Sequence, residues 1–332
     1  MKKIKKALIS VSDKKNLGSL LKILAKYKIK LISSGGTYKE IKKLKFKCLE
    51  VSEYTGSPEI LGGRVKTLHP KIHAGILSKR NDKSHAKELK ANQYDEIDLV
   101  IVNFYPFEKT LEQTTNHSKI IENIDVGGPT MVRAAAKNYN DVTVITSSNQ
   151  YETLINELEH NKGSTSIEFR EKMSSEAFSE TAYYDAVISN YFNKIKKDNF
   201  PKKKIIYGNL IEKLRYGENP HQKASFQGDL DTLFTKLSGK ELSYNNLLDV
   251  DAAVALITDI SSEGHCTFAV LKHNNACGCA KGSSTFEAFT EALAADPVSA
   301  FGGILISDAE IDLATAEKIN EIFYEVLIAP SY

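Results

Sequence analysis

Residues 7–37 read ALISVSDKKNLGSLLKILAKYKIKLISSGGT. The apolar runs Ala7–Val11 and Lys30–Ser33 predict two short buried strands. Between them, from Lys14 to Tyr27, apolar residues recur with a helical period, and Thr37–Leu44 predicts a second helix. Strands that alternate with helices indicate a parallel sheet covered on both faces. This stretch therefore predicts an α/β fold.

The rest of the chain continues the alternation. The β-branched runs Leu99–Val102 and Val142–Ile145 predict further strands, and residues 151–197 predict an uninterrupted helical region. Further elements are predicted in the second half: strands at Thr267–Leu271 and Ile304–Ile306, and helices at Ser284–Ala295 and Leu313–Ile322.

A chain of 332 residues is expected to form two domains. The charge-rich segment Lys194–Lys204 carries Pro201 and is the best candidate for the boundary. We therefore predict one α/β domain over residues 1–197 and another over residues 198–332.

Bulk properties argue against several classes of protein. The net charge of +2 gives no reason to expect a nucleic-acid partner, and no apolar stretch approaches the roughly 20 residues that span a membrane. Four cysteines, at positions 48, 266, 277 and 279, do not resemble a disulfide framework. A cytoplasmic protein is expected.

The run Thr55–Leu77 reads TGSPEILGGRVKTLHPKIHAGIL. Arg64, Lys66 and Lys71 lie in it, and no acidic residue occurs between Glu59 and Asp82. The cations alternate with apolar residues and are bracketed by glycines and a proline. This pattern predicts a rigid loop and a short strand whose charges converge on an anion.

Two hydroxyl-rich turns indicate a phosphate site. Ser33–Thr37 follows a strand and opens a helix, where glycines and hydroxyls turn N–H and O–H donors toward a ligand and the helix dipole favours negative charge. Ser10–Lys14 repeats this pattern after the first strand. Either turn could also be an ordinary helix cap. Together with Arg64 and Lys66 they favour phosphate binding.

Two more segments carry polar groups suited to chemistry. Asp125 precedes two glycines and a proline, and an Ala-rich helix from Thr130 to Lys137 follows. Asn103–Phe107, at the end of a strand, supplies an amide and a phenol. Asp125 could equally cap a helix, Lys137 could be an ordinary exposed lysine, and Asn103–Phe107 could be a packed loop.

Most of the first 195 residues closely resemble the cyclohydrolase domain of the bifunctional purine-biosynthesis enzymes, which combine aminoimidazole carboxamide ribotide (AICAR) transformylase with IMP cyclohydrolase. The run Arg64–His73 is highly specific to that family. The resemblance implies a methylglyoxal-synthase-like parallel-sheet domain that closes the purine ring of formyl-AICAR to give IMP. It rests on the segments Ser10–Lys14, Ser33–Thr37, Thr55–Leu77, Asn103–Phe107 and Glu122–Asn138.

The resemblance also implies roles for single residues. Lys66 and Lys137 would stabilise the oxyanion and transfer protons, Asp125 would orient the carboxamide or accept its proton, and Tyr105 would assist. The implied substrate-binding set is Ser12, Lys14, Ser34, Gly36, Thr37, Arg64, Thr67, Asn103, Gly127 and Gly128.

A second candidate site begins at the end of the strand predicted over Thr267–Leu271. The adjacent Lys272 and His273 suit an acid/base pair. A zinc site is disfavoured because Cys277-Gly-Cys279 is too short a spacing and no second pair exists. Arg215 and Tyr216, in a Gly/Pro-stiffened loop, suit clamping a phosphate against a heterocycle, although a surface turn is also credible.

These residues resemble the transformylase domain of the same enzymes, which has a cytidine-deaminase-like α/β fold without zinc. Its Lys-His-x-Asn-Pro-Cys-Gly motif is matched by Lys272–Gly278, with Ala276 in place of proline, a change expected to loosen the turn. The resemblance implies that His273 helps deprotonate the AICAR amine as it attacks 10-formyltetrahydrofolate, and that Lys272 stabilises the oxyanion or helps protonate the departing folate nitrogen. The implied ribotide ligands are Arg215, Tyr216 and Asn275.

The family continues well past the point that matches Tyr332. We therefore expect this chain to hold only the first part of the transformylase domain and to be competent only for ring closure. A homodimer without a bound cofactor is expected, with purine ribotides (AICAR, formyl-AICAR and IMP) and folate as its ligands.

Two other functions fit the first domain. A phosphosugar lyase of the methylglyoxal-synthase type shares the fold and the phosphate turn, but it would not explain Lys272 and His273. A non-catalytic nucleotide-sensing module would need no converging proton-transfer groups, whereas Lys66, Asp125 and Lys137 suggest such groups.

Overall fold

The computed structural model describes residues 1–197, 200–228 and 230–332. The chain forms two compact units, Met1–Tyr207 and Gly208–Tyr332. Each unit is described by itself.

The predicted domain boundary lies between residues 197 and 198, and residues 198 and 199 lie outside the described part of the chain. The compact units divide further along, between Tyr207 and Gly208. The boundary at residue 197 therefore stays a prediction.

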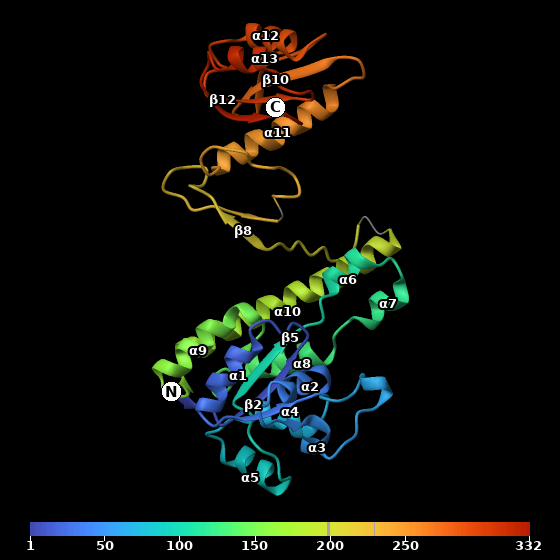
Figure 1. The fold of residues 1–332 in the computed structure, drawn as a ribbon, viewed down its shortest axis with the longest axis vertical. Coiled ribbons are helices and arrows are strands. Elements are labelled where there is room, and N and C mark those ends of the chain that lie inside the picture. Colours follow the sequence, from blue (N-terminus) through green and yellow to red (C-terminus); the bar gives the residue numbers. More distant parts are fainter. Residues whose placement is uncertain (198–199, 229) are drawn as a thin grey trace. The chain divides into compact units, whose positions relative to one another are not determined.

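A five-stranded parallel sheet forms the centre of the first unit, with strand order β4-β3-β2-β5-β6 (Figure 1). Leu8 in β2 lies opposite Ile32 in β3 and Val100 in β5. The central strands are short, apolar and buried, as expected for a parallel sheet covered on both faces. The four strands predicted in this unit are confirmed. The sheet contains β2 (Lys6–Val11), β3 (Lys30–Ser33), β4 (Leu49–Glu50), β5 (Leu99–Asn103) and β6 (Thr143–Ile145).

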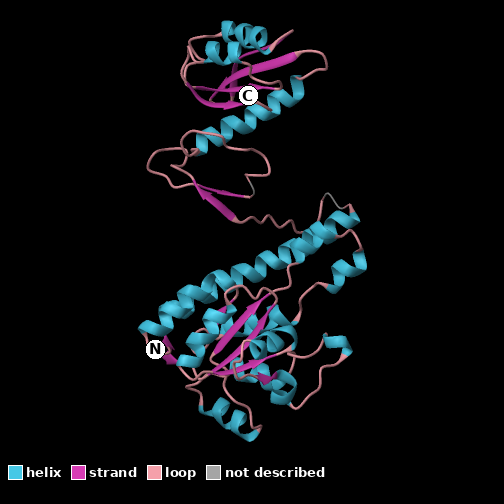
Figure 2. Ribbon diagram, viewed as in Figure 1, coloured by secondary structure: helices cyan, strands magenta, loops and turns pink. Residues whose placement is uncertain are grey.

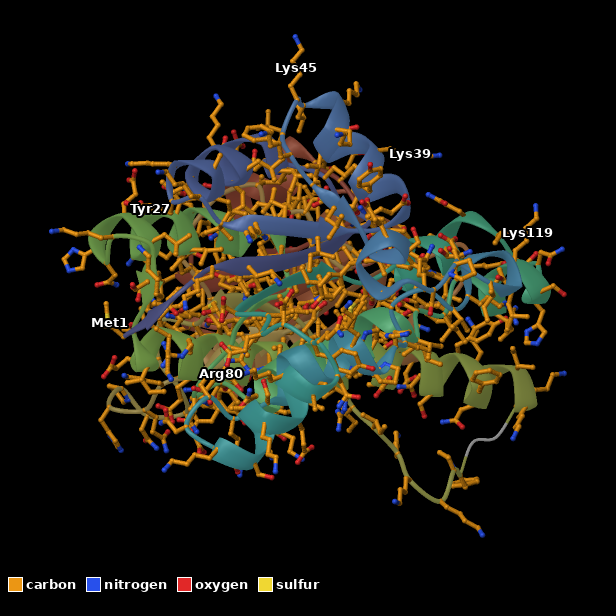
Figure 3. The ribbon with its side chains drawn as sticks, turned by 90° about the horizontal axis from the view of Figure 1, so that it is seen from below. Met1, Tyr27, Lys39, Lys45, Arg80 and Lys119 are labelled. Carbon is orange, nitrogen blue, oxygen red and sulfur yellow. The ribbon has the colours of Figure 1, made fainter. Side chains whose placement is uncertain are left out.

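Helices flank both faces of this sheet (Figures 2 and 3). Helix α8 packs against β5 and β6, and α10 packs against α8. The helices of the unit are α1 (Leu17–Lys26), α2 (Gly35–Lys43), α3 (Val51–Thr55), α4 (Pro70–Leu77), α5 (Lys83–Ala91), α6 (Phe107–Gln113), α7 (His117–Glu122), α8 (Gly127–Lys137), α9 (Tyr151–His160) and α10 (Ile167–Lys196), with 3-10 turns at Leu61–Gly63 and Ser148–Gln150.

The prediction of uninterrupted helix from residue 151 to 197 is wrong. Lys162 and Gly163 both adopt positive φ angles, 50° and 80°, which end a right-handed helix. The chain then forms β7 (Ser164–Thr165), which pairs antiparallel with β1 (Lys2–Lys3). Local apolar periodicity does not reveal this pairing, because β1 lies at the other end of the unit's sequence.

A four-stranded mixed sheet of order β11-β10-β12-β13 forms the centre of the second unit. Helix α11 contributes Ala253 and Ile257 to one hydrophobic cluster, whereas Phe289 of α12 packs with Phe268 of β10 in another. The predicted strands and helices of this unit are confirmed within a few residues at their ends. Its elements are β8 (Leu210–Lys213), β9 (Ser225–Gln227), α11 (Tyr244–Ile260), β10 (Cys266–Lys272), β11 (Asn275–Gly282), α12 (Thr285–Ala295), β12 (Gly303–Ser307), α13 (Leu313–Ile319) and β13 (Tyr324–Ile328).

The first unit carries charged side chains on its outside. The lysines labelled in Figure 3, Lys39, Lys45 and Lys119, are exposed and extend away from the sheet. Among the described residues, we find no helix with both the length and the apolar character that crossing a membrane requires.

Tyr151 provides a test of packing in the first unit. Its side chain is only 2% exposed, and its hydroxyl has no hydrogen-bond partner within the described residues. A buried unpaired hydroxyl costs roughly 1–3 kcal/mol. We therefore expect Tyr151→Phe to leave the urea midpoint of unfolding unchanged or to raise it. The free energy of unfolding should increase by at most about 1 kcal/mol. A clear fall in the midpoint would show that the hydroxyl is satisfied in solution.

Candidate active site

The first site lies where the order in which the chain adds strands to the sheet reverses. From β2 the chain proceeds outward to β3 and β4, then returns to the other side of β2 to form β5 and β6. In open parallel sheets, ligands bind beyond the carboxyl ends of the strands at such a switch point. Here these ends lead into the turn at Ser12, the start of α2 at Gly35 and the loop at Tyr105.

A cavity of about 580 Å³ lies at this edge. Among its lining residues are all but one of the predicted cyclohydrolase residues, namely Ser12, Lys14, Ser34, Gly36, Thr37, Arg64, Lys66, Thr67, Asn103, Tyr105, Asp125, Gly127 and Gly128. The sequence segments that carry them are far apart, so the fold brings them together.

Lys137 is not among the lining residues. It is exposed and is the last residue of α8, whereas the first residues of that helix line the cavity. Ten residues of helix span about 15 Å. The single chain therefore does not bring Lys137 to the cavity, and its role in proton transfer stays a prediction.

The amino terminus of α2 and two lysines form a cationic cradle. Ser34 caps the helix in an extended conformation, and Gly35 follows with a φ of 53°. Lys66 Nζ lies 3.6 Å from the position that a Cβ on Gly35 would occupy, and Lys14 Nζ lies 3.9 Å from the equivalent position on Gly36. Because a helix amino terminus also favours anions, this region suits a phosphate.

Other predicted ligands hold the turn after β2 in shape. Asn103 Oδ1 accepts hydrogen bonds from the backbone N–H groups of Ser12 at 2.6 Å and Asp13 at 3.0 Å, while its Nδ2 donates to the Asp13 carbonyl. Thr37 Oγ1 accepts from Val11 N–H and donates to Val11 O, both at 2.9 Å. Direct ligand contacts by these side chains stay a prediction.

The backbone of the cationic run Thr55–Leu77 forms tight turns and helix in place of the predicted loop and short strand. An isolated bridge joins Ile60 to Val65, and Leu61, Gly62 and Gly63 all have positive φ angles between them. The short strand is therefore wrong, because left-handed backbone at three successive residues turns the chain back on itself. Pro70 then starts α4, a position where its missing N–H costs nothing.

Two carboxylates lie against these cations. Glu122 from α7 forms an ion pair with Arg64, with an Nε···Oε1 distance of 3.2 Å. The hydrogen bond from the Arg64 guanidinium lowers the pKa of the Glu122 carboxyl. Glu59 Oε1 lies 3.2 Å from Lys66 Nζ. No acidic residue occurs between Glu59 and Asp82 in the sequence, yet two carboxylates lie against these cations in the structure. The sequence reasoning missed both partners, since Glu122 is distant in sequence and Glu59 lies just before the acid-free stretch.

Lys71 does not join this cavity. Its Nζ lies 4.9 Å from the centre of the Tyr54 ring and is not part of the cavity lining. Lys71 is the second residue of α4, whereas Lys66 precedes that helix.

Asp125 is half-buried in the loop before α8. Burial raises the pKa of its carboxyl above the ordinary value, while hydrogen bonds from the Gly128 and Tyr105 N–H groups and the charge of Lys66 oppose that rise. The Gly128 N–H donates to Asp125 Oδ1 at 2.8 Å. A Cβ on Gly128 would lie 2.5 Å from Asp125 Oδ2, so glycine allows this close approach. A carboxylate with a raised pKa beside a lysine is suited to proton transfer.

In the second unit, Lys272 and His273 lie at the end of β10 as predicted. His273 and Asn274, with φ angles of 53° and 62°, form the tight turn into β11, which matches a type I′ hairpin turn. Lys272 Nζ donates to the Phe301 carbonyl at 2.6 Å, and His273 is exposed. Asn275 Nδ2 donates to the His273 carbonyl at 2.8 Å.

The expectation that Ala276 loosens this turn stays a prediction. Ala276 lies in β11 opposite Leu271, next to a bulge, and not among the two turn residues. The pairing of β10 with β11 sets the local backbone there.

Arg215 and Tyr216 contact one another. The Arg215 guanidinium carbon lies 5.1 Å from the centre of the Tyr216 ring. The Tyr216 carbonyl accepts from Tyr244 N–H at 3.3 Å, and Asn274 N–H donates to Asp249 Oδ1 at 2.7 Å. The Arg215–Tyr216 segment and the turn after Lys272 are thus both hydrogen-bonded to the first half of α11. Their binding of a ribotide stays a prediction.

In the part of the chain that the structure describes, no group of three or more His, Cys, Asp or Glu side chains is arranged to hold a metal ion.

Comparison with known proteins gives consistent matches for both units. Residues 135–332 match the family model described as AICARFT/IMPCHase bienzyme, and residues 16–130 match the MGS-like domain model. A protein of Bacteroides thetaiotaomicron named bifunctional purine biosynthesis protein PurH is 48% identical over 331 residues, which cover 100% of this chain and 64% of the relative. The PurH protein of Bradyrhizobium diazoefficiens is 45% identical over 334 residues, covering 99% of this chain and 63% of the relative.

A solved structure is also similar. The crystal structure of ForH superposes with a TM-score of 0.51 at 30% identity, covering 57% of this chain and 99% of that one. The chain spans a little under two thirds of the length of the curated relatives that it matches.

Proposed function

Because this chain belongs to the AICARFT/IMPCHase bienzyme family, we propose that its first unit closes the purine ring of formyl-AICAR to give IMP. The relatives are named as bifunctional purine biosynthesis proteins. One observation carries the proposal: Lys66, Tyr105 and Asp125 line the same cavity as the amino terminus of α2.

Ring closure is an intramolecular reaction. The carboxamide nitrogen attacks the formyl carbonyl carbon, a carbon–nitrogen bond forms, and the former carbonyl oxygen leaves as water after protonation. Because both reacting groups belong to one molecule, holding the reactive rotamer provides much of the acceleration. The cradle at α2 would bind the ribotide phosphate, so the base of the substrate would extend toward Asp125.

Three side chains are assigned to the chemistry. Asp125 would accept the carboxamide proton, a role that its raised pKa suits because a general base works best near the working pH. Lys66 would stabilise the oxyanion that develops on the formyl oxygen. Tyr105, which is exposed at the cavity, would assist proton movement to the leaving oxygen.

For the second unit we propose part of a formyl-transfer site with 10-formyltetrahydrofolate as co-substrate. His273 would deprotonate the AICAR amine and Lys272 would stabilise the oxyanion, with Arg215, Tyr216 and Asn275 binding the ribotide. Since the chain spans under two thirds of its relatives, we propose that it performs only ring closure when taken alone. A homodimer remains a prediction of the family resemblance, and a cytoplasmic location remains a prediction from the cysteine pattern.

Three turnover assays on the chain test these proposals. We expect IMP to form from formyl-AICAR, with no methylglyoxal from dihydroxyacetone phosphate and no formyl transfer from 10-formyltetrahydrofolate to AICAR. Methylglyoxal formation would favour the lyase, and binding of IMP without turnover would favour a sensing module. Formyl transfer by this chain would contradict the proposal that it performs ring closure only.

A further inference from the structure

Tyr184, on α10, contacts the loop that carries Asp125. Its side chain is only 7% exposed. Its hydroxyl oxygen accepts a hydrogen bond from the Asp125 backbone N–H at 2.8 Å and donates to the Asn123 carbonyl at 3.4 Å. The phenol therefore bridges two backbone groups on either side of residue 124.

The ring of Tyr184 contacts a second loop of the site. Its centroid lies 5.0 Å from that of Phe104 and 6.3 Å from that of Phe107, in tilted and edge-on geometries that favour aromatic pairs. These phenylalanines flank Tyr105, whose backbone N–H donates to the Asp125 carboxylate. One side chain thus contacts both loops from which the carboxylate takes its position.

We propose that Tyr184 is a positioning residue that holds the backbone of Asp125 and the Tyr105 loop in the geometry needed for ring closure. The inference rests on the function proposed for the first unit. Tyr184 is not among the residues that line the cavity, so it would act through Asp125 and not on the substrate.

The electrostatics of Tyr184 agree with a fixed, neutral phenol. Burial raises its pKa to about 12, so the hydroxyl stays protonated across the working range of pH. It can therefore accept the Asp125 N–H and donate to Asn123 at the same time, and it does not exchange protons with the substrate.

The test compares Tyr184→Phe with Tyr183→Phe. Both substitutions remove one hydroxyl from the same helix, but the Tyr183 hydroxyl donates to Glu108 Oε1 of α6 at 2.6 Å. We expect Tyr184→Phe to lower kcat for ring closure by about 10- to 100-fold with little change in KM, since small misplacements of a catalytic group have effects of that size. Tyr183→Phe should retain the parent kcat.

Two further measurements separate positioning from simple stability. A loosened loop admits water to Asp125, so its raised pKa should fall and the acid limb of the kcat profile should move to lower pH in Tyr184→Phe. Amide hydrogen exchange in the peptide around Asp125 should be faster in that variant, a readout that does not require turnover.

The outcomes distinguish the two proposals. If the parent chain makes no IMP, the proposed function fails, whatever the variants show. If the parent is active but Tyr184→Phe matches it in kcat, acid limb and amide exchange, the positioning role is wrong. A rise in KM with unchanged kcat would also overturn it.

Discussion

Asp125→Asn is expected to lower kcat for ring closure by about 10²- to 10⁴-fold, the range that general-base catalysis contributes. Asparagine keeps the shape of the side chain, and its oxygen can still accept the Gly128 N–H, but it cannot take a proton from the substrate. Because the loop and the cationic cradle remain, the affinity for IMP should change by only a few-fold. Steady-state kinetics and calorimetric titration with IMP measure the two effects.

The same substitution should not destabilise the protein. A carboxyl whose pKa is raised by folding contributes stability that is fully present below its unfolded pKa and is lost as the pH rises through its folded pKa. Ionised Asp125 therefore costs stability at neutral pH, and the uncharged amide removes this cost. We expect an equal or higher Tm at pH 7.

The pH dependence adds a second check. In the parent, kcat/KM should fall as the pH drops through the pKa of Asp125, which lies above the ordinary value of 3.8. That acid limb should be absent from Asp125→Asn. The matched control is Asp82→Asn, because Asp82 is a partly exposed cap of α5 and asparagine caps helices equally well. Turnover within a few-fold of the parent in Asp125→Asn would exclude the carboxylate as the base.

Lys66→Met is expected to lower kcat by about 10²- to 10³-fold, the typical loss when one oxyanion-stabilising donor is removed. Methionine preserves the length and apolar stem of the lysine but removes the charge. Lys66 also lies at the α2 cradle and 3.2 Å from Glu59, so its removal leaves that carboxylate near the cavity without its partner. A modest rise in KM should accompany the loss.

Lys71→Met is the control for Lys66→Met. Both lysines belong to the same cationic run, but Lys71 lies over the Tyr54 ring and outside the cavity. Its replacement should leave kcat unchanged. If Lys66→Met raised KM but kept the parent kcat, Lys66 would bind substrate and transition state equally well, and its assignment to the oxyanion would be wrong.

Much of the fold follows from local pattern. The runs Lys30–Ser33 and Leu99–Val102 predict strands because a strand buried on both faces needs continuous apolar residues, and β3 and β5 occur there. Asp125 and its two glycines likewise identify the loop before α8. The gathering of Ser12, Ser34 and Tyr105 around one cavity follows from a parallel sheet, since the carboxyl ends of β2, β3 and β5 share one edge.

Other features depend on contacts between distant parts of the chain. Arg64 pairs with Glu122, and the Asp125 N–H pairs with Tyr184 on a helix of a different layer. No periodicity in the sequence encodes these pairs, because they depend on the order of strands in the sheet and on which helix packs beside α8. Lys137 shows that closeness in sequence does not ensure closeness in the structure. It follows Asp125 by one helix, yet it lies at the far end of α8 and does not line the cavity.

The amino-acid sequence alone determined the alternation of strands and helices and the parallel sheet, because these depend on apolar period within short segments. The resemblance of its motifs to a known family identified most residues of the cavity. Tertiary structure decided which carboxylates meet Arg64 and Lys66, how deeply Asp125 is buried, and which phenol holds its loop. These properties arise from desolvation and hydrogen bonding between segments that only the packed core brings within reach.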